Sequence, residues 1–178
     1  MTTATIVEEI REKIRSVKNF PKEGIIFRDI TTALKDAHTL RLIVDYMCDC
    51  FKDTKIDYIV GIESRGFILG TPMAYKLNAG FVPIRKPNKL PAKTYSQEYS
   101  LEYGTDKIEI HADAIPQGAN VLIVDDLLAT GGTADAACKL VKKAGGNLVG
   151  MAFLIELAAL KGRNKFDKNL KVESLLKY

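Results

Sequence analysis

The sequence lacks the features that would place the protein in a membrane or in the secretory route. No run of apolar residues approaches the roughly 20 that a membrane-spanning helix needs. The first residues, Met1 to Thr5, contain no basic segment followed by an apolar run, so no secretory signal is indicated. We therefore expect no membrane association and a cytoplasmic location.

Metal-site and disulfide patterns are also missing. The three cysteines are odd in number, and Cys48 and Cys50 lack the spacing and the histidine company of a zinc site. We expect Cys48, Cys50 and Cys138 to be reduced, structural residues. His38 and His111 are isolated in the sequence, so we expect them to be capping or surface groups.

Nucleotide and nucleic-acid motifs are absent as well. There is no G-x-G-x-x-G after a strand and no G-x-x-x-x-G-K-[ST], which argues against a dinucleotide fingerprint and a triphosphate loop. The net charge of +4 is modest and comes without a clustered basic stripe, so the chain suits a small polyanionic ligand and not a nucleic acid. With 178 residues and no linker or repeat, the sequence predicts one domain over residues 1–178, able to bury about 70% of its unfolded surface.

The most informative stretch is Val121 to Thr133, which reads V-L-I-V-D-D-L-L-A-T-G-G-T. Its leading apolar run predicts a parallel strand that is buried on both faces, with Asp125 and Asp126 at its carboxyl end. The glycines then open a helix over Ala134 to Ala144. N–H groups without partners at the start of that helix, with the two threonine hydroxyls, form an anion site of phosphate size. Carboxylates beside a phosphate site suit hydroxyls or Mg²⁺, so the stretch predicts a ribose phosphate ligand.

This stretch resembles the phosphoribosyl-pyrophosphate (PRPP) signature of the type I phosphoribosyltransferases. The resemblance implies that the paired acids hold the ribose hydroxyls and that the glycine-threonine loop holds the 5′-phosphate. It also implies Mg²⁺ as a cofactor, held mainly through the substrate, with the two acids as candidate protein ligands. The residues assigned to PRPP here are Asp125, Asp126, Ala129, Thr130, Gly131, Gly132 and Thr133.

A second buried strand, Ile56 to Ile62, precedes the tetrapeptide E-S-R-G and helical spacing from Phe67 to Leu77. Open α/β sheets bind ligands at the carboxyl ends of adjacent parallel strands, so we expect Arg65 to face the same crevice as Asp125. By resemblance, E-S-R-G is the pyrophosphate loop, with Arg65 on the leaving group.

Two segments are similar to parts of the adenine phosphoribosyltransferases. Phe20 to Ile30 alone predicts an ordinary edge strand after a proline-glycine turn. In that family the matching segment covers the purine base, which implies that Phe27 stacks on adenine while backbone groups of Ile26, Phe27 and Arg28 read its edge. An E-L pair at the end of a strand from Leu148 implies Leu157 on the opposite face of adenine.

The segment from Arg85 to Lys93 carries four cations and two prolines, a composition that folds over a polyanion more readily than it builds a core. Continued through Glu98, it is longer than compact domains tolerate without a functional reason, so we predict an active-site lid. Arg85, Lys86 and Lys89 are assigned to PRPP. Family members are dimers in which the arginine matching Arg85 reaches the neighbouring active site, which implies a homodimer.

After the lid, Tyr99 to Ile110 predicts a β-hairpin around a glycine turn. Its Y-S-L-E-Y-G sequence is similar to a loop motif of the same family, whose glutamate exchanges a proton with the base. The resemblance therefore implies that Glu102 is catalytic.

The remaining patterns predict helices and strands that complete an α/β fold. The expected architecture is a three-layer sandwich with a mostly parallel sheet of five or six strands, the phosphoribosyltransferase type I fold, carrying the long active-site lid loop. Pro83 places its own strand at an edge of the sheet. The expected helices are Ala4 to Ser16 and Ala37 to Phe51, and the expected strands are Phe81 to Ile84 and Val172 to Leu176.

The reaction implied by the resemblance belongs to purine salvage: adenine and PRPP give AMP and pyrophosphate. Two alternatives stay open. A hypoxanthine, guanine or xanthine transferase would share the PRPP loop but would need a partner for a 6-oxo group, and the F-P-x-x-G-I-x-F segment disfavours it. A non-catalytic PRPP sensor could reuse the fold, although such regulators usually add a helix-turn-helix, for which the amino-terminal region is too short.

Overall fold

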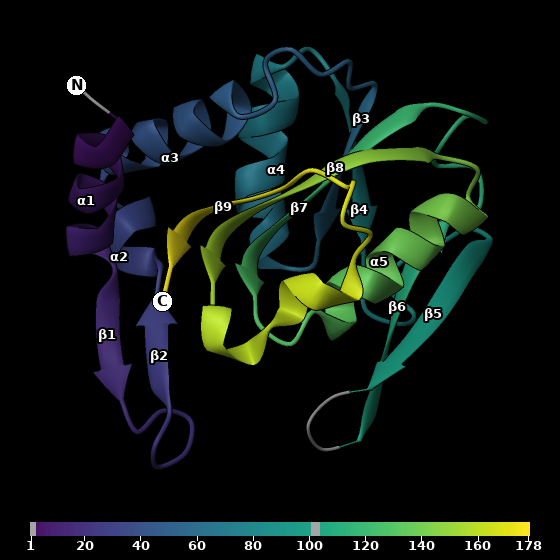
Figure 1. The fold of residues 1–178 in the computed structure, drawn as a ribbon. Helices are drawn as coiled ribbons and strands as arrows, with labels where there is room; N and C mark the ends of the chain where they lie inside the picture. The colour runs from purple at the N-terminus through teal and green to yellow at the C-terminus, as the bar shows by residue number, and fades with distance from the viewer. Residues whose placement is uncertain (1–2, 101–103) are drawn as a thin grey trace. The chain divides into compact units, whose positions relative to one another are not determined.

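The computed structural model describes residues 3–100 and 104–178 (Figure 1). The chain divides into two compact units, Met1–Tyr46 and Met47–Tyr178, which are described separately. The single domain expected over residues 1–178 stays a prediction. Among the described residues, no helix has the length and apolar character needed to span a bilayer.

The first unit combines short helices with a two-stranded antiparallel sheet, β1–β2. The predicted amino-terminal helix is present but ends early, because the chain turns at Ile14 into a strand that pairs with the predicted edge strand. Asp29 ends that strand and accepts hydrogen bonds from the Thr31 backbone N–H (2.9 Å) and hydroxyl (2.7 Å). Its pKa is lowered to about 2 by these bonds and by Arg15. The elements are α1 (Thr3–Lys13), β1 (Arg15–Lys18), β2 (Ile26–Asp29), α2 (Thr31–Leu34) and α3 (Ala37–Asp49), the last crossing the boundary between the units.

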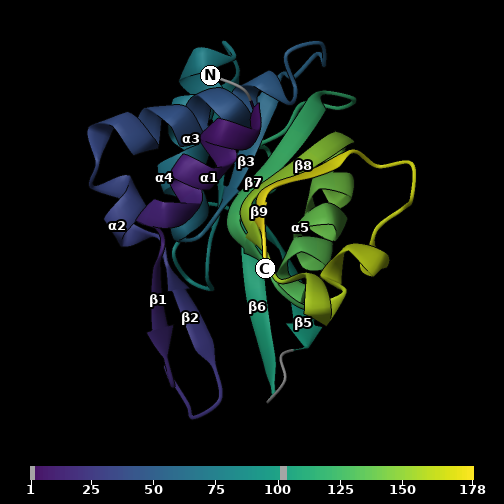
Figure 2. The same cartoon turned by 60° about the vertical axis from the view of Figure 1, so that its left-hand side comes forward.

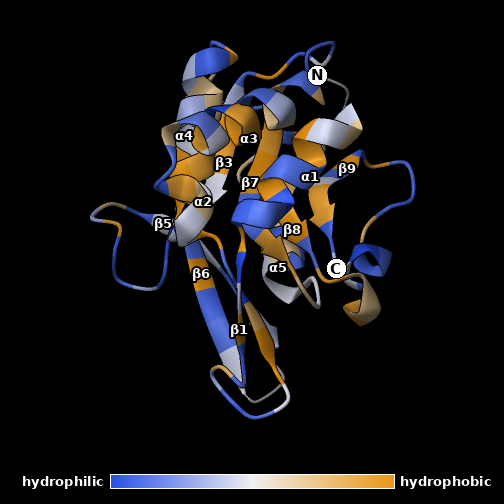
Figure 3. Ribbon diagram, turned by 90° about the vertical axis from the view of Figure 1, so that its left-hand side faces the viewer, coloured by the Kyte–Doolittle hydropathy of each residue, from blue (hydrophilic) through white to orange (hydrophobic). Residues whose placement is uncertain are grey.

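The second unit is built on a parallel sheet with the order β4-β3-β7-β8-β9, five strands among the described residues. The predicted central strand, β7, is its middle strand, and Val121 to Val124 are fully buried. β4, which contains Pro83, is an edge strand as predicted. Figure 3 shows the matching hydrophobic colouring along β3, β7 and β8. The strands are β3 (Tyr58–Ile62), β4 (Gly80–Ile84), β7 (Asn120–Leu128), β8 (Asn147–Glu156) and β9 (Val172–Lys177).

Two helices, α4 (Arg65–Lys76) and α5 (Gly132–Lys143), cover opposite faces of this sheet (Figures 1 and 2). The β3-α4-β4 and β7-α5-β8 connections run in opposite directions along the sheet, and right-handed crossovers of opposite direction place their helices on opposite faces. The strand order therefore reverses between β3 and β7, where such sheets bind ligands.

The segment predicted as a long lid loop is a loop only over residues 85–93. Its continuation forms β5 (Thr94–Ser100), which pairs antiparallel with β6 (Thr105–His111), as the predicted hairpin requires. The Arg85 and Glu109 backbones exchange hydrogen bonds of 2.9 and 2.8 Å. Tyr99, Ile108 and Ile110 are buried in one hydrophobic cluster with residues of α5. The composition of residues 85–98 does not indicate this packing, because the buried residues are Tyr99, which directly follows that segment, and Ile108 and Ile110 on β6.

All three cysteines are free thiols, in agreement with the prediction, and Cys48 and Cys138 are buried. Burial raises the pKa of Cys138 to about 11. His38 lies on the surface with its Nε2 atom 2.9 Å from Glu9 Oε1. The Nε2 atom of His111 is buried, which differs from the surface position expected.

Candidate active site

A cavity of about 460 Å³ lies at the carboxyl ends of β3 and β7, where the strand order reverses. One wall is the turn from β3 into α4, and the other is the end of β7 with the loop into α5. Lys86 and Tyr99 contribute from the segment that enters the hairpin. The lining residues are 62–65, Lys86, Tyr99 and 125–134.

The paired acids lie inside β7 and not after its end, because the strand continues to pair with β8 as far as Leu128. Asp125 Oδ1 accepts a hydrogen bond of 2.9 Å from the Asp126 backbone N–H. Removal from water raises the pKa of Asp125 well above its ordinary value, and the charge of Asp126 adds to this rise. Burial also raises the pKa of Asp126, while the charge of Arg65 opposes the rise. The two carboxyls therefore titrate as one coupled pair.

Arg65 is the first residue of α4 and lines the same cavity as Asp125, as expected for the ends of adjacent parallel strands. Its Nε atom lies 3.0 Å from Asp126 Oδ2, and its side chain keeps 39% of its surface exposed. The peptide bond between Glu63 and Ser64, just before it, is cis. The arrangement places a partly exposed guanidinium beside the acid pair, and such a group is suited to binding an anion.

The loop between β7 and α5 has the geometry of an anion site. Gly131 is the N-cap of α5 with φ 80°, in the left-handed region that glycine adopts readily. The N–H groups of the first helical turn that follows have no acceptors within the helix, and the helix dipole is positive at this end. Thr130 and Thr133 line the cavity at this loop. A helix start of this geometry can bind an anion, and the assignment of the loop to a phosphate stays a prediction.

Lys86 reaches the cavity from a cluster on the hairpin. Its Nζ atom donates to Tyr99 Oη at 3.0 Å and also contacts Asp106 Oδ2. Tyr99 Oη in turn donates to the same Asp106 oxygen at 3.0 Å. Burial lowers the pKa of Lys86, but the hydrogen bonds to Asp106 and Tyr99 and the charges of these groups together outweigh it, so the net direction is upward. The ammonium therefore stays charged at the edge of the cavity.

Arg85 and Lys89 are not among the residues that line this cavity. The Arg85 guanidinium donates to both carboxylate oxygens of Glu63, at 3.1 and 3.2 Å, and Lys86 N–H donates to Glu63 at 2.8 Å. The hydrogen bond from Arg85 is the main reason that the pKa of Glu63 is lowered. Arg85 Nη1 also donates to the Lys89 carbonyl at 3.5 Å. Their assignment to PRPP stays a prediction.

The residues assigned to adenine are divided between the two units. Ile26, Phe27 and Arg28 lie on β2 in the first unit, and the Phe27 ring packs edge-on against Phe20 with centroids 5.2 Å apart. Leu157 lies in the second unit directly after β8, where its N–H donates to the Leu128 carbonyl at 2.9 Å. Glu102, assigned to proton exchange, lies outside the described residues.

Sequence reasoning missed the two carboxylates that organise the basic segment, Glu63 and Asp106. Each binds a cation about 20 residues away in the chain, so no local pattern marks it. The one available signal was the excess of cations in the segment from Arg85 to Lys93, which calls for acidic partners elsewhere.

The carboxylates of the cavity suit a metal cation whose remaining oxygen ligands come from a bound substrate and water. Among the described residues, no cluster of three or more His, Cys, Asp or Glu could hold a metal ion. Asp125 and Asp126 supply carboxylate oxygens, which Mg²⁺ prefers, but the ion completes its shell with substrate phosphates and water in such sites.

Comparisons with known proteins agree with this geometry. A family model described as "Phosphoribosyl transferase domain" matches residues 31–174. The adenine phosphoribosyltransferase of Trichodesmium erythraeum is 55% identical over 170 residues, which is 96% of this chain and 99% of that protein. The structure of the adenine phosphoribosyltransferase from Thermoanaerobacter pseudethanolicus matches with a TM-score of 0.93 at 50% identity, over 97% of this chain and 99% of that one. The Saccharomyces cerevisiae structure, complexed with an imino-altritol bisphosphate and adenine, gives 0.91 at 43% identity over 97% and 99%.

Proposed function

The chain belongs to the phosphoribosyltransferase family, among the adenine phosphoribosyltransferases, and we propose that it forms AMP and pyrophosphate from adenine and PRPP. The observation that carries this proposal is the cavity between β3 and β7, which joins a coupled acid pair to a helix-start anion loop. This combination fits a diol beside a phosphate. Purine salvage follows from the relatives, which are adenine phosphoribosyltransferases.

The anion loop over residues 129–133 holds the 5′-phosphate of PRPP. Its backbone N–H groups and threonine hydroxyls supply donors, and they need no counter-cation because the helix dipole is positive there. The Asp125–Asp126 pair accepts hydrogen bonds from the ribose hydroxyls. The negative charge of this pair also stabilises the cationic sugar that forms as pyrophosphate departs.

Arg65 and Lys86 stabilise the leaving pyrophosphate, because both line the cavity and both carry a positive charge. Arg65 Nε lies 3.0 Å from Asp126 Oδ2, and its side chain is 39% exposed at the cavity, which suits contact with an anionic ligand. Asp125 and Asp126 would be the protein ligands of a Mg²⁺ ion bound mainly through the substrate, and the ion would supply Lewis-acid neutralisation of the phosphate charge.

The residues assigned to adenine take the following roles in each unit. On β2, the Phe27 ring stacks on adenine while backbone groups of Ile26 and Arg28 read the base edge. Leu157, directly after β8, packs on the opposite face of the base from Phe27 when adenine binds. Glu102 takes the exchangeable proton from adenine. General acid–base assistance is worth about 10²–10⁴-fold, so Glu102→Gln lowers kcat by that factor in single-turnover measurements. A kcat close to wild type excludes Glu102 from the chemistry.

A cytoplasmic homodimer completes the proposal. Ile68 and Tyr75, which share one face of α4, are 46% and 90% exposed, unusual for large apolar side chains on a helix. Arg85 extends from the end of β4 and serves the neighbouring active site. Light scattering on the wild-type protein tests this assembly, and a fully active monomer contradicts it.

A base-specificity assay tests the proposed activity. Purified protein with PRPP and Mg²⁺ is given adenine, hypoxanthine or guanine, and pyrophosphate release is followed. We expect rapid pyrophosphate release when adenine is the base, and none with hypoxanthine or guanine. Turnover with a 6-oxopurine instead identifies the alternative transferase, and PRPP binding without turnover of any base identifies a sensor.

A further inference from the structure

The turn that follows β8 packs directly beneath the anion loop. It consists of two 3₁₀ turns, Ala158–Leu160 and Gly162–Lys165, joined at Lys161. A Cβ built on Gly131 would lie 2.6 Å from the Gly162 carbonyl oxygen, and one built on Gly162 would lie 2.2 Å from the Ala129 carbonyl oxygen. No side chain fits between these backbones. The position of Gly162 therefore limits where the anion loop can lie.

Arg163, the next residue, is held by a dense set of polar contacts. Its Nε donates to Glu156 Oε1 at 3.1 Å and its Nη2 to Glu156 Oε2 at 2.6 Å, a two-pronged pair. Nη1 donates to the Val172 carbonyl and Nη2 also reaches Ser174 Oγ at 3.3 Å, both on β9. A planar guanidinium satisfies this geometry, whereas an ammonium cannot.

Glu156 ends β8 and is 6% exposed, and the cavity of the site does not include it. The hydrogen bond from Arg163 lowers the pKa of Glu156, and the same bond raises the pKa of Arg163. Both groups stay charged across the neutral range. Burying this carboxylate without its partner would cost desolvation free energy, and apolar side chains could fill the same space without that cost. Packing alone therefore does not explain the pair.

The two ends of the turn are held by different means. At its start, Leu157 N–H donates to the Leu128 carbonyl at 2.9 Å and Ala158 N–H to the Tyr178 carbonyl at 2.8 Å, so backbone bonds to the sheet hold this end. At its far end, Arg163 ties the backbone next to Gly162 to β8 and β9. Loss of the Arg163 side chain frees Gly162 without freeing Leu157.

We propose that Glu156 and Arg163 form a positioning pair that fixes Gly162 under Gly131 and thereby sets the anion loop for the phosphate of PRPP. This inference rests on the proposed function. It predicts that loss of the pair weakens PRPP binding but not adenine binding. PRPP binding depends on the loop above Gly162, whereas Leu157, assigned to adenine, is anchored by other contacts. Small misplacements of binding groups are costly, about 10²-fold for displacements near 1 Å.

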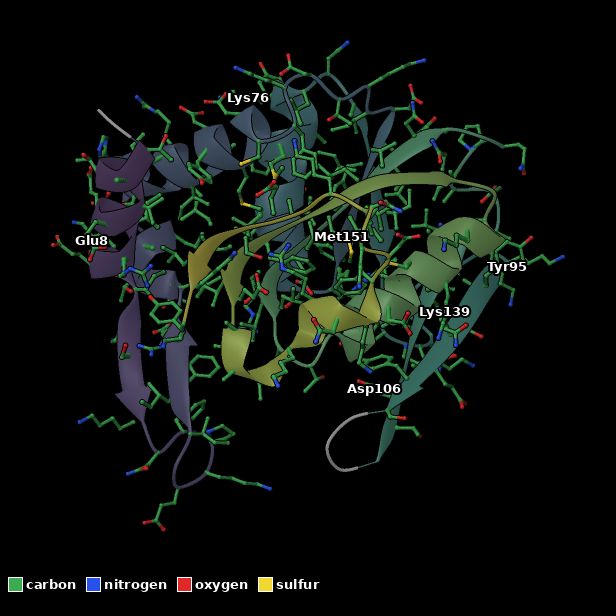
Figure 4. The ribbon with its side chains drawn as sticks, in the orientation of Figure 1. Glu8, Lys76, Tyr95, Asp106, Lys139 and Met151 are labelled. Carbon is green, nitrogen blue, oxygen red and sulfur yellow. The ribbon has the colours of Figure 1, made fainter. Side chains whose placement is uncertain are left out.

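The test uses variants that disturb the pair and the contact separately. Arg163→Lys keeps the positive charge but loses the planar guanidinium that binds both Glu156 oxygens. The double variant Glu156→Gln, Arg163→Met removes both charges, so neither is left buried without a partner. Gly162→Ala leaves the pair intact and pushes on the Ala129 carbonyl. The control is Lys139→Met, in the middle of α5 and outside the cavity lining, which removes an exposed 2.8 Å ion pair with Asp135 and leaves the Gly131–Gly162 contact intact (Figure 4).

Each variant is measured by titration calorimetry with ribose 5-phosphate, by separate KM values for PRPP and adenine, and by urea unfolding. We expect the double variant and Gly162→Ala to weaken ribose 5-phosphate binding and raise the PRPP KM by about tenfold to a hundredfold, with adenine KM unchanged. Arg163→Lys falls between these and wild type, and Lys139→Met matches wild type.

Two results overturn the proposal. One is wild-type affinity for ribose 5-phosphate in a folded double variant. The other is an equal rise in both KM values that follows the loss of stability, which describes a structural role alone. If ribose 5-phosphate binding depends on the pair as predicted, but the wild type transfers the phosphoribosyl group of PRPP to no base, the proposed function fails and the positioning pair stands.

Discussion

Replacing Arg65 with methionine separates the electrostatic role of the guanidinium from its packing. Arg65 Nε lies 3.0 Å from Asp126 Oδ2. Coulomb's law at an effective dielectric constant of about 20 gives roughly 5 kcal/mol for unit charges at this distance. Solvent screening of a side chain that is 39% exposed reduces the net stabilisation to about 1–2 kcal/mol. The variant should therefore fold, with a modest loss of stability at neutral pH.

The pH dependence of that loss has a definite sign. Burial already raises the pKa of Asp126, and the charge of Arg65 is the main influence that lowers it, so the variant raises this pKa further. Below the folded pKa of Asp126 in the wild type, the carboxyl is protonated in both proteins and their stabilities converge. Above the higher pKa of the variant, the full difference is present. Urea unfolding from acidic to neutral pH measures this window.

Activity should fall more than stability in the same variant. Removing one donor that stabilises transition-state charge costs about 10²–10³-fold in kcat. Steady-state rates with PRPP and adenine, and inhibition by pyrophosphate, give the readout, and pyrophosphate should bind more weakly. Unchanged kcat with unchanged pyrophosphate affinity refutes the assignment of Arg65 to the leaving group. A stability difference that grows toward acidic pH refutes the stabilisation assigned to the Arg65–Asp126 pair.

Three further changes probe the same site. Asp125→Asn should abolish most PRPP use without lowering stability at neutral pH, because burial already disfavours the charged carboxyl; urea unfolding and the PRPP KM check this. Gly131→Ala should cost more than about 1–2 kcal/mol in unfolding free energy, since φ is 80° there and the added Cβ would lie 2.6 Å from the Gly162 carbonyl oxygen; an unchanged urea midpoint contradicts it. Asp106→Asn should release Lys86 and lower amide-exchange protection along β5 and β6; unchanged protection means that the cluster does not hold the hairpin.

The sequence predicts most clearly those parts of the fold that are encoded locally. The buried run Val121 to Val124 has no polar alternation, so it predicts a central parallel strand, and β7 is the middle strand of the sheet. Pro83 predicts an edge position for β4, which the structure confirms. The glycines after β7 likewise predict a helix, expected from Ala134, and α5 begins two residues earlier, at Gly132.

Features that depend on distant partners were not predictable. β1 consists of mostly exposed residues and is a strand only because β2 pairs with it, so the predicted helix, Ala4 to Ser16, extended into its first two residues. The lid interpretation failed to foresee that Tyr99 and Ile108 pack with α5. Glu63 and Arg85 are 22 residues apart, and Glu156 and Arg163 are joined only by the geometry of a turn.

The central claim is that the cavity between β3 and β7 is the PRPP site, and a crystal structure of the wild-type protein with PRPP and Mg²⁺ tests it most directly. The account predicts the 5′-phosphate on the backbone N–H groups of residues 130–133, the ribose hydroxyls on Asp125 and Asp126, and the pyrophosphate on Arg65. A well-ordered PRPP molecule whose 5′-phosphate lies away from this loop contradicts the account.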